Sequence, residues 1–251
     1  EKILNKDTGQ TRHQVGREKF VKMGEDCVEK NRGEMKTQMP RMGASLDWSR
    51  EAYTLDEKRG IAVNEAFKRM YNAGLIYRGY RVVNWDPKGQ TTVSDEEVNH
   101  EAQKGTLYTF RYTKDFPIAI SSTRPETKVG DTAVAVHPAD PRYKEFVGKT
   151  YDLDFAGKKL SIRVIADEAV DPEFGTGALG VTPAHSQIDF EMHSRHDLPL
   201  IPVINEFAKM TDEAGPLVAG KKTKDARETI VTWLKENDLL EKDEEVEMNI
   251  S

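Results

Sequence analysis

One stretch of the sequence decides the fold: Phe174-Gly-Thr-Gly-Ala-Leu-Gly-Val-Thr-Pro-Ala-His-Ser-Gln-Ile-Asp-Phe-Glu191. Gly175 and Gly177 permit a tight turn and let a ligand approach the backbone closely. The apolar run over residues 178–182 predicts a short strand. The proline that follows it favours a helix start, which we expect near Ser186. The stretch therefore predicts a turn, a strand and a helix in quick succession.

Similar short strands are predicted on both sides of this stretch, from about Gly105 onward. Each is rich in β-branched or aromatic residues and is bounded by turn residues. Besides 178–182, the candidates are Thr106 to Tyr112, Pro117 to Ser122, Thr132 to Val136, Leu160 to Ile165 and Leu200 to Ile204. A second helix is expected near Pro141. This pattern indicates an α+β protein whose residues 105–215 form a barrel-like β domain with surrounding helices, and not a doubly wound parallel sheet.

Residues 1–80 are interpreted as a helical N-terminal flank. Its best helix opens with Thr54 and Glu57 at capping-box spacing, carries apolar residues on one face and stops at Gly74. An earlier helix is expected around residues 17–30. The flank therefore reads as helical throughout, unlike the strand-rich part that follows it.

The remaining segments are a hairpin and a C-terminal helix. Residues 81–104 are interpreted as a β-ribbon linker, because extended arms flank the turn Asp86-Pro87-Lys88-Gly89. Residues 216–251 are expected to hold one helix, from Thr223 to about Asn237, and then an acidic linker. That acidic end, residues 235–251, carries a net charge of −5 out of −6 for the whole chain. The rest of the chain is therefore nearly neutral.

Composition narrows the class of protein. The chain has 251 residues, of which 37% are hydrophobic and 32% charged, and its mean hydropathy is −0.68. No apolar run approaches the roughly 20 residues that span a bilayer, and the N-terminus does not read as a signal peptide. With Cys27 as the single cysteine, no intrachain disulfide can form. We expect a cytoplasmic, monomeric protein without membrane contact.

A second segment, Ser121-Ser-Thr-Arg-Pro-Glu-Thr127, places hydroxyl groups beside an arginine at a strand end. The proline biases Arg124 toward an extended backbone and so fixes where its guanidinium points. A guanidinium so placed suits a phosphate, a carboxylate or a carbonyl group. The alternative is a strand end closed by a turn, with Arg124 paired to Glu126 or another acid. The residues alone leave both interpretations open.

A polar face is predicted on the helix after Ser186. His185, Asp189, His193 and His196 fall on one side of it. A metal-dependent hydrolase is one interpretation, but the spacing does not match the zinc pattern of two histidines and a glutamate. The alternatives are a solvated face, and an Asp189 that interacts favourably with the helix dipole. We expect no metal ligands here.

Taken together, the ordered segments resemble the valyl-tRNA synthetase family of class I. The similar blocks are Gly43–Glu51, Gly74–Arg78, Val83–Trp85, Thr91–Val98, Ser122–Pro138 and Phe174–Leu200. The continuation from Gly130 to Pro138 resembles valyl rather than leucyl or isoleucyl enzymes. Neither a His-Ile-Gly-His-like nor a Lys-Met-Ser-Lys-Ser-like signature is present, so aminoacylation is not expected. The resemblance implies a fragment with the inserted editing domain, connective peptide 1, and needs no cofactor, since ATP and Mg²⁺ serve the full-length synthetase.

The family's editing reaction is hydrolysis of threonyl-tRNA(Val). A hydrophobic pocket rejects an isostere with one more hydroxyl by only about 10²-fold, which is the known figure for valine-activating enzymes. The partners implied are the 3′ CCA end of tRNA(Val) carrying threonine, and the remainder of the synthetase chain. By resemblance, Asp189 holds the substrate ammonium, Arg124 and Thr123 face the terminal adenosine and the scissile bond, and His185 orients water. The substrate-binding residues implied are Phe174, Gly175, Thr176, Gly177, Thr182, Ser122, Glu126 and Ser186.

The sequence departs from the family pattern at a few positions. Many members carry lysine at the position of Gly180 and aspartate at that of Ser186, so one charge of each sign is missing from the implied pocket. Asp86 and Gly89 stand where relatives often have a cysteine pair, which excludes a zinc ribbon. Two alternatives to the valyl editing interpretation remain. They are a tRNA-binding fragment that is inactive in isolation, and the editing domain of an isoleucyl or leucyl enzyme.

Overall fold

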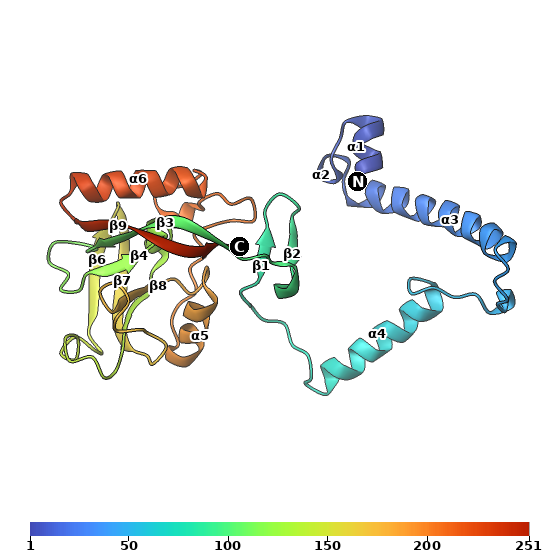
Figure 1. Cartoon of the computed structure of the whole chain (residues 1–251). Helices are drawn as coiled ribbons and strands as arrows, with labels where there is room; N and C mark the ends of the chain where they lie inside the picture. Colours follow the sequence, from blue (N-terminus) through green and yellow to red (C-terminus); the bar gives the residue numbers. More distant parts are fainter. Residues whose placement is uncertain (251) are drawn as a thin grey trace. The chain divides into compact units, whose positions relative to one another are not determined.

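The computed structural model describes residues 1–250, which divide into two compact units, Glu1–Arg78 and Gly79–Ser251. The first unit is helical, as predicted (Figure 1). Its elements are α1 (Lys2–Thr8), α2 (Arg12–Val15), α3 (Arg17–Arg41), the 3₁₀ turn η1 (Trp48–Arg50) and α4 (Glu57–Asn72).

Two details of the first unit differ from the sequence prediction. The cap of α4 is Asp56, whose carboxylate accepts from the Arg59 amide, and not the Thr54 hydroxyl. Aspartate is at least as good an N-cap as threonine, and it lies nearer to the apolar face. Helix α3 also continues through Pro40 to Arg41, although Pro40 cannot donate the backbone hydrogen bond of that turn.

The second unit is a mixed α+β structure. Its strands are β1 (Asn84–Asp86), β2 (Thr91–Val93), β3 (Glu101–Phe110), β4 (Ile120–Ser122), β5 (Ala133–Val136), β6 (Thr150–Phe155), β7 (Lys158–Ala166), β8 (Ala178–Val181) and β9 (Leu240–Ile250). Its helices are α5 (Gln187–His196) and α6 (Thr223–Glu236), with 3₁₀ turns η2 (Asp95–Glu97), η3 (Pro125–Gly130) and η4 (Asp212–Ala214). The hairpin β1–β2 and helices α5 and α6 confirm the predictions for those segments.

The strands form three separate sheets in residues 1–250, with orders β1-β2, β4-β3-β9 and β6-β7-β5-β8. Only β5 and β7 are parallel. The α+β class is confirmed, but the β domain that was predicted to be barrel-like consists of open sheets in this part of the chain, with no closed barrel. Strand β4 lies against β8 but forms no ladder with it. It stops at Ser122, because Pro125 lacks an amide donor and starts η3 instead.

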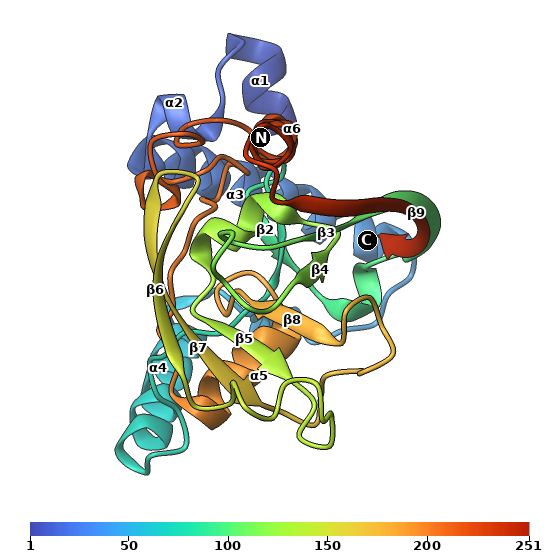
Figure 2. The ribbon, with the colours of Figure 1, turned by 90° about the vertical axis from the view of Figure 1, so that its left-hand side faces the viewer.

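The acidic C-terminus corrects the prediction of a linker. Strand β9 runs antiparallel to β3 along its whole length, with Leu240 opposite Phe110 and Ile250 opposite Glu101 (Figures 1 and 2). Ion pairs between the strands accompany the ladder, such as Lys104 Nζ to Glu245 Oε1 at 2.6 Å. A charged edge strand resists pairing with further chains, so the acidity that suggested a linker suits this place in the sheet.

Other segments near the sheet also differ from the prediction. Residues 141–147 form turns and not a helix, and residues 200–204 contribute a single bridge, Ile204 to Met210. Strand β6 was not predicted, although polar and apolar residues alternate along it as in a half-buried strand. None of the helices in the described residues combines the length and apolar composition that crossing a bilayer requires.

Two packed layers flank strand β5. Val134 and Val136 point into the main core, which also takes in the buried face of α6. Ala133 and Ala135 point the other way and pack with Met192 of α5 (Figure 2). Each buried large aliphatic side chain contributes about 1.5–3 kcal/mol. Helix α5 is therefore fixed against the end of β8, where the candidate site lies.

Candidate functional site

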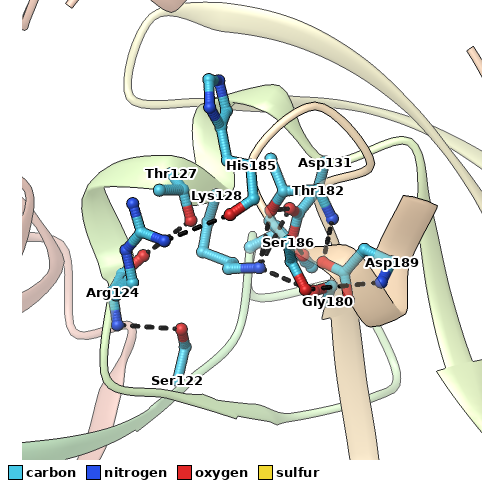
Figure 3. Close-up of polar contacts among 11 residues, drawn as sticks. Ser122, Arg124, Thr127, Lys128, Asp131, Gly180, Thr182, His185, Ser186 and Asp189 are labelled. Carbon is cyan, nitrogen blue, oxygen red and sulfur yellow. Dashed lines mark hydrogen bonds and ion pairs between the residues drawn. The ribbon is translucent and has the colours of Figure 1, made fainter. Parts of the chain in front are cut away.

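The segment after β4 is held by its own side chains. The Arg124 amide donates to Ser122 Oγ at 3.1 Å, and the Thr127 hydroxyl donates to the Arg124 carbonyl at 3.0 Å. All six residues of η3 are buried, whereas the Arg124 side chain remains 46% exposed. The Thr123 hydroxyl forms no hydrogen bond within residues 1–250. This segment therefore presents the Arg124 guanidinium, which Figure 3 shows, and the Thr123 hydroxyl, from a backbone held by its own side-chain hydrogen bonds.

The connection from β8 to α5 fixes one carboxylate. Ser186 caps α5, and its hydroxyl accepts from the Asp189 amide at 3.3 Å. Asp189 Oδ2 in turn accepts from the Thr182 amide at 2.7 Å. The Ser186 cap satisfies one donor at the helix start, and Asp189 lies in the first turn of α5, at the positive end of the helix dipole. Asp189 is only 5% exposed.

The second oxygen of Asp189 remains open. No hydrogen bond to Oδ1 is formed by any residue from 1 to 250. Thr132 Oγ1 is the only fully buried side-chain nitrogen or oxygen without a partner in that range, so Asp189 Oδ1 keeps contact with solvent. A carboxylate with one oxygen fixed and one open can receive a cation such as an ammonium group.

The two segments meet through side chains of the first. Arg124 Nη1 donates to the His185 carbonyl at 3.2 Å. Lys128 Nζ donates to the Gly180 carbonyl at 2.6 Å and to Thr182 Oγ1 at 2.8 Å. Figure 3 shows this ammonium between the two segments. These bonds hold the segment with Arg124 and Lys128 against the segment from Gly180 to His185.

The His185 side chain links the β8–α5 connection to residues 203–204. Its Nε2 accepts from the amides of Val203 at 2.8 Å and Ile204 at 3.2 Å. Burial, together with the nearby charges of Arg124 and Lys128, lowers the pKa of His185 to about 4. The imidazole is therefore neutral at pH 7, and Figure 3 shows it directed away from Asp189.

Glu126 is fully occupied by an ion pair. Its side chain is 1% exposed, and its two oxygens accept from Nε and Nη2 of Arg227 in α6 at 2.9 and 2.7 Å. Arg124 Nε lies 3.9 Å from the same carboxylate. The Glu126 carboxylate therefore joins η3 to α6 and has no free oxygen for a substrate, in line with the turn-closing alternative for this segment.

The glycine-rich turn lies against β4. A Cβ at Gly175, whose φ is +57°, would come within 2.6 Å of the Ser121 side chain, so only glycine fits there. The Thr176 hydroxyl is engaged with the backbone of Ala178 at 3.3 Å. Phe174 is 56% exposed. It is the apolar residue of this turn that is open to a ligand.

Three functional residues escaped the sequence analysis. Asp131 is 1% exposed and accepts from the hydroxyls of Tyr112 and Thr182 and from Lys128 Nζ, the last at 3.1 Å. Lys128 and Tyr112 are buried as well. The available signal was a lysine and an aspartate three residues apart within an otherwise uncharged, buried run. The Thr182 hydroxyl is consumed by this cluster and does not face a substrate.

The polar face of α5 does not converge on a metal. His193 Nδ1 contacts the Leu198 carbonyl, and His196 Nε2 lies 2.8 Å from Asp167 Oδ2, an acid that Arg195 also binds. Hydrogen bonds from Arg195 and His196 lower the pKa of Asp167 to about 2 against the opposing effect of burial. No cluster of three or more potential ligands occurs among the described residues.

Comparisons with known proteins agree with the resemblance in the sequence. The chain is 46% identical to the valine–tRNA ligase of Thermotoga maritima over 248 residues, which cover 98% of this chain and 28% of that protein. It is 45% identical to that of Aquifex aeolicus, covering 98% of this chain and 22% of that protein. The chain thus spans about a quarter of the length of these relatives.

A solved structure and a family model complete the comparison. The ternary complex of LeuRS, tRNA and LeuAMS from Agrobacterium radiobacter has a TM-score of 0.37 and 19% identity, covering 91% of this chain and 36% of that chain. The family model described as tRNA synthetases class I (I, L, M and V) matches residues 1–246. With this match over almost its whole length and valine–tRNA ligases among its relatives, the chain belongs to the class I tRNA synthetase family.

Proposed function

We propose that this chain is the editing part of a valyl-tRNA synthetase and hydrolyses threonine from mischarged tRNA(Val). The observation that carries the proposal is Asp189, a carboxylate fixed through Oδ2 and open through Oδ1. It lies where two segments meet that both resemble the family's editing blocks. The α-ammonium of an aminoacyl ester is the cation that such a carboxylate receives.

The roles of the neighbouring residues follow from which side-chain groups remain exposed or without a hydrogen bond in the described part of the chain. Arg124 has an exposed guanidinium for a phosphate or the adenosine of the CCA end. Thr123 has an unbonded hydroxyl, which suits the threonine side chain or the scissile region. Phe174 offers an exposed ring as an apolar wall. His185 and Glu126 are positioning residues, because their polar atoms are committed to the protein.

The reaction requires little protein chemistry. Water attacks the ester carbonyl, the bond to the ribose oxygen breaks, and that oxygen takes a proton as the free amino acid leaves. The neighbouring ammonium already makes the carbonyl electrophilic, so fixing the ammonium on Asp189 and the adenosine on Arg124 positions the carbonyl relative to water. The adjacent ribose hydroxyl, and not a side-chain base, assists the water.

Selectivity follows from hydrogen bonding. A pocket that bonds the threonine hydroxyl leaves its own polar group unpaired when valine enters, at a cost of about 1–3 kcal/mol. That cost corresponds to about 10- to 100-fold slower hydrolysis of correctly charged tRNA. Thr123 is the unbonded hydroxyl from which we expect this discrimination, and its replacement by valine tests that role.

The direct test uses the whole chain with threonyl-tRNA(Val) and valyl-tRNA(Val). We expect hydrolysis of the threonyl ester well above the rate in buffer, and at most slow hydrolysis of the valyl ester. Chelator should not change the rate, which separates this proposal from a metal hydrolase. Binding of tRNA(Val) without hydrolysis of either ester at micromolar protein would instead support the alternative of a tRNA-binding fragment.

A further inference from the structure

We propose that Lys128 is a positioning residue of the editing site, which neutralises Asp131 so that Asp189 is the one carboxylate open to the substrate ammonium. The inference rests on the proposed function and concerns a part of the site that no substrate touches. Its basis is a buried cluster made of Lys128, Asp131 and Thr182, which Figure 3 labels, together with Tyr112.

The Lys128 ammonium is completely enclosed by acceptors. Its side chain is 5% exposed, and Nζ donates to Asp131 Oδ1, the Gly180 carbonyl and Thr182 Oγ1 at 3.1, 2.6 and 2.8 Å. These three bonds use all three N–H donors of an ammonium group. Nothing is left to bind a ligand directly, so any effect of Lys128 on the substrate is transmitted through its partners.

Asp131 is the group that needs the ammonium. Burial raises the pKa of Asp131, and the charge of Lys128 is the largest influence that lowers it again, followed by the hydroxyls of Thr182 and Tyr112. Asp189 acts in the opposite direction, because a second negative charge nearby favours protonation. The pKa of Asp131 stays raised overall, and the ammonium of Lys128 at 3.1 Å is the main influence that favours its ionised form.

Thr182 transmits the arrangement to the open carboxylate. Its hydroxyl is bound on one side by Lys128 and Asp131, and its amide donates on the other side to Asp189 Oδ2 at 2.7 Å. A residue held at both groups cannot rotate without breaking a buried bond. The pair Lys128–Asp131 therefore fixes the direction of Asp189 Oδ1 through Thr182.

Gly180 supports the same conclusion. A Cβ at this position would overlap the Asp131 carboxylate and come within 2.6 Å of the Tyr112 hydroxyl. The family pattern places a lysine there, but in this chain the space belongs to Asp131 and an ammonium reaches the Gly180 carbonyl from Lys128 instead. A positive charge therefore does lie next to the backbone of position 180, supplied by η3.

The test removes first the ammonium and then its partner charge. In Lys128→Met, Asp131 faces Tyr112, Thr182 and Asp189 with no cation, and His185 loses one positive neighbour. We expect kcat/KM for threonyl-tRNA(Val) to fall about tenfold relative to the unchanged chain as the pH rises from 6 to 9, because Asp131 must ionise unpaired. In Lys128→Met/Asp131→Asn that extra pH dependence should disappear. Lys144→Met, at an exposed position, is the matched control and should behave like the unchanged chain.

Two outcomes would overturn the inference. One is a Lys128→Met profile parallel to that of the unchanged chain at equal activity. The other is a loss of equal size at every pH in both the single and the double variant, which would indicate packing alone. Thermal unfolding against pH gives a readout without substrate, since Lys128→Met should lose stability as pH rises above the unfolded-state pKa of aspartate, about 3.9, and the double variant should not. If the unchanged chain fails to hydrolyse the ester, the proposed function fails, whereas flat stability profiles would contradict the charge pairing itself.

Discussion

The two units use apolar residues differently. In Glu1–Arg78, Leu4 is the only buried large apolar side chain, whereas Val63 is 64% and Phe67 59% exposed on α4. In the second unit, Ile230 and Leu234 of the equally amphipathic α6 are fully buried in the main core. Periodicity thus predicts a helix correctly in both cases, but stability depends on whether a surface faces the apolar side. Every site residue named above lies in the unit that has its own core.

The largest effect is expected at Asp189. Replacing it with alanine removes the partner of the substrate ammonium, and loss of one side of a desolvated charge pair costs about 2–5 kcal/mol. We expect threonyl-tRNA(Val) deacylation to fall by at least about 30-fold while circular dichroism still reports a folded second unit. Asp152→Ala, at an exposed position on β6, is the control, and an active Asp189→Ala variant would refute the assigned role.

The ion pairs of the two units should respond unequally. Glu126→Gln replaces a buried carboxylate that accepts two hydrogen bonds from Arg227, and so removes the ion pair. We therefore expect the free energy of unfolding of the second unit to fall by about 2–3 kcal/mol. Glu51 makes comparable contacts with Arg32 and Lys36, but at the solvent-exposed surface of the first unit. Glu51→Gln should therefore leave urea unfolding unchanged. Equal responses of both variants would contradict the contrast between the units.

His185 should make the second unit sensitive to acid. Its folded-state pKa of about 4 lies below the ordinary 6.5, so the neutral form is the one the fold requires. Its contribution is complete above pH 6.5 and is lost as the pH falls toward 4, by about 2–3 kcal/mol. His185→Gln keeps a hydrogen-bond acceptor but cannot titrate. In this variant the free energy of unfolding should depend less on pH between 6.5 and 4. If the free energy of unfolding of the variant falls with pH as steeply as that of the unchanged chain, groups other than His185 cause the acid sensitivity.

The smallest effect is expected on α4. Phe67→Ser removes a ring that is 59% exposed and lies in the first unit, outside both buried core clusters, so we expect the stability of the second unit to change by less than about 0.5 kcal/mol. Deacylation should be unaffected. A clear loss of activity in Phe67→Ser would show that the helical unit takes part in the reaction.

The sequence predicts elements with a local cause and misses those set by a distant partner. Ser186 predicts the start of α5, and the turn at Asp86–Gly89 predicts the β1–β2 hairpin, because each signal lies within a few residues of the element it predicts. Strand β9 carries acids that read as a linker, and only pairing with β3, more than a hundred residues earlier, makes it a strand. The open sheets likewise depend on where β4 stops.

The site shows the same limit. Asp189 and Arg124 were selected through the resemblance to the family, because residue chemistry alone left a structural role equally open for both. Glu126 was assigned to the substrate, since nothing local reveals that Arg227 would occupy both oxygens. The ammonium of Lys128 beside Gly180 was equally hidden, because Lys128 lies in η3 and Gly180 in β8, and the two meet only in the folded chain.

Single-turnover deacylation by residues 79–251 alone tests most directly whether the editing chemistry lies in the second unit. We predict that this unit hydrolyses threonyl-tRNA(Val) at a rate within about threefold of the whole chain and spares valyl-tRNA(Val). Residues 1–78 alone should hydrolyse neither. A folded 79–251 unit that leaves the threonyl ester untouched, while the whole chain hydrolyses it, would contradict the assignment.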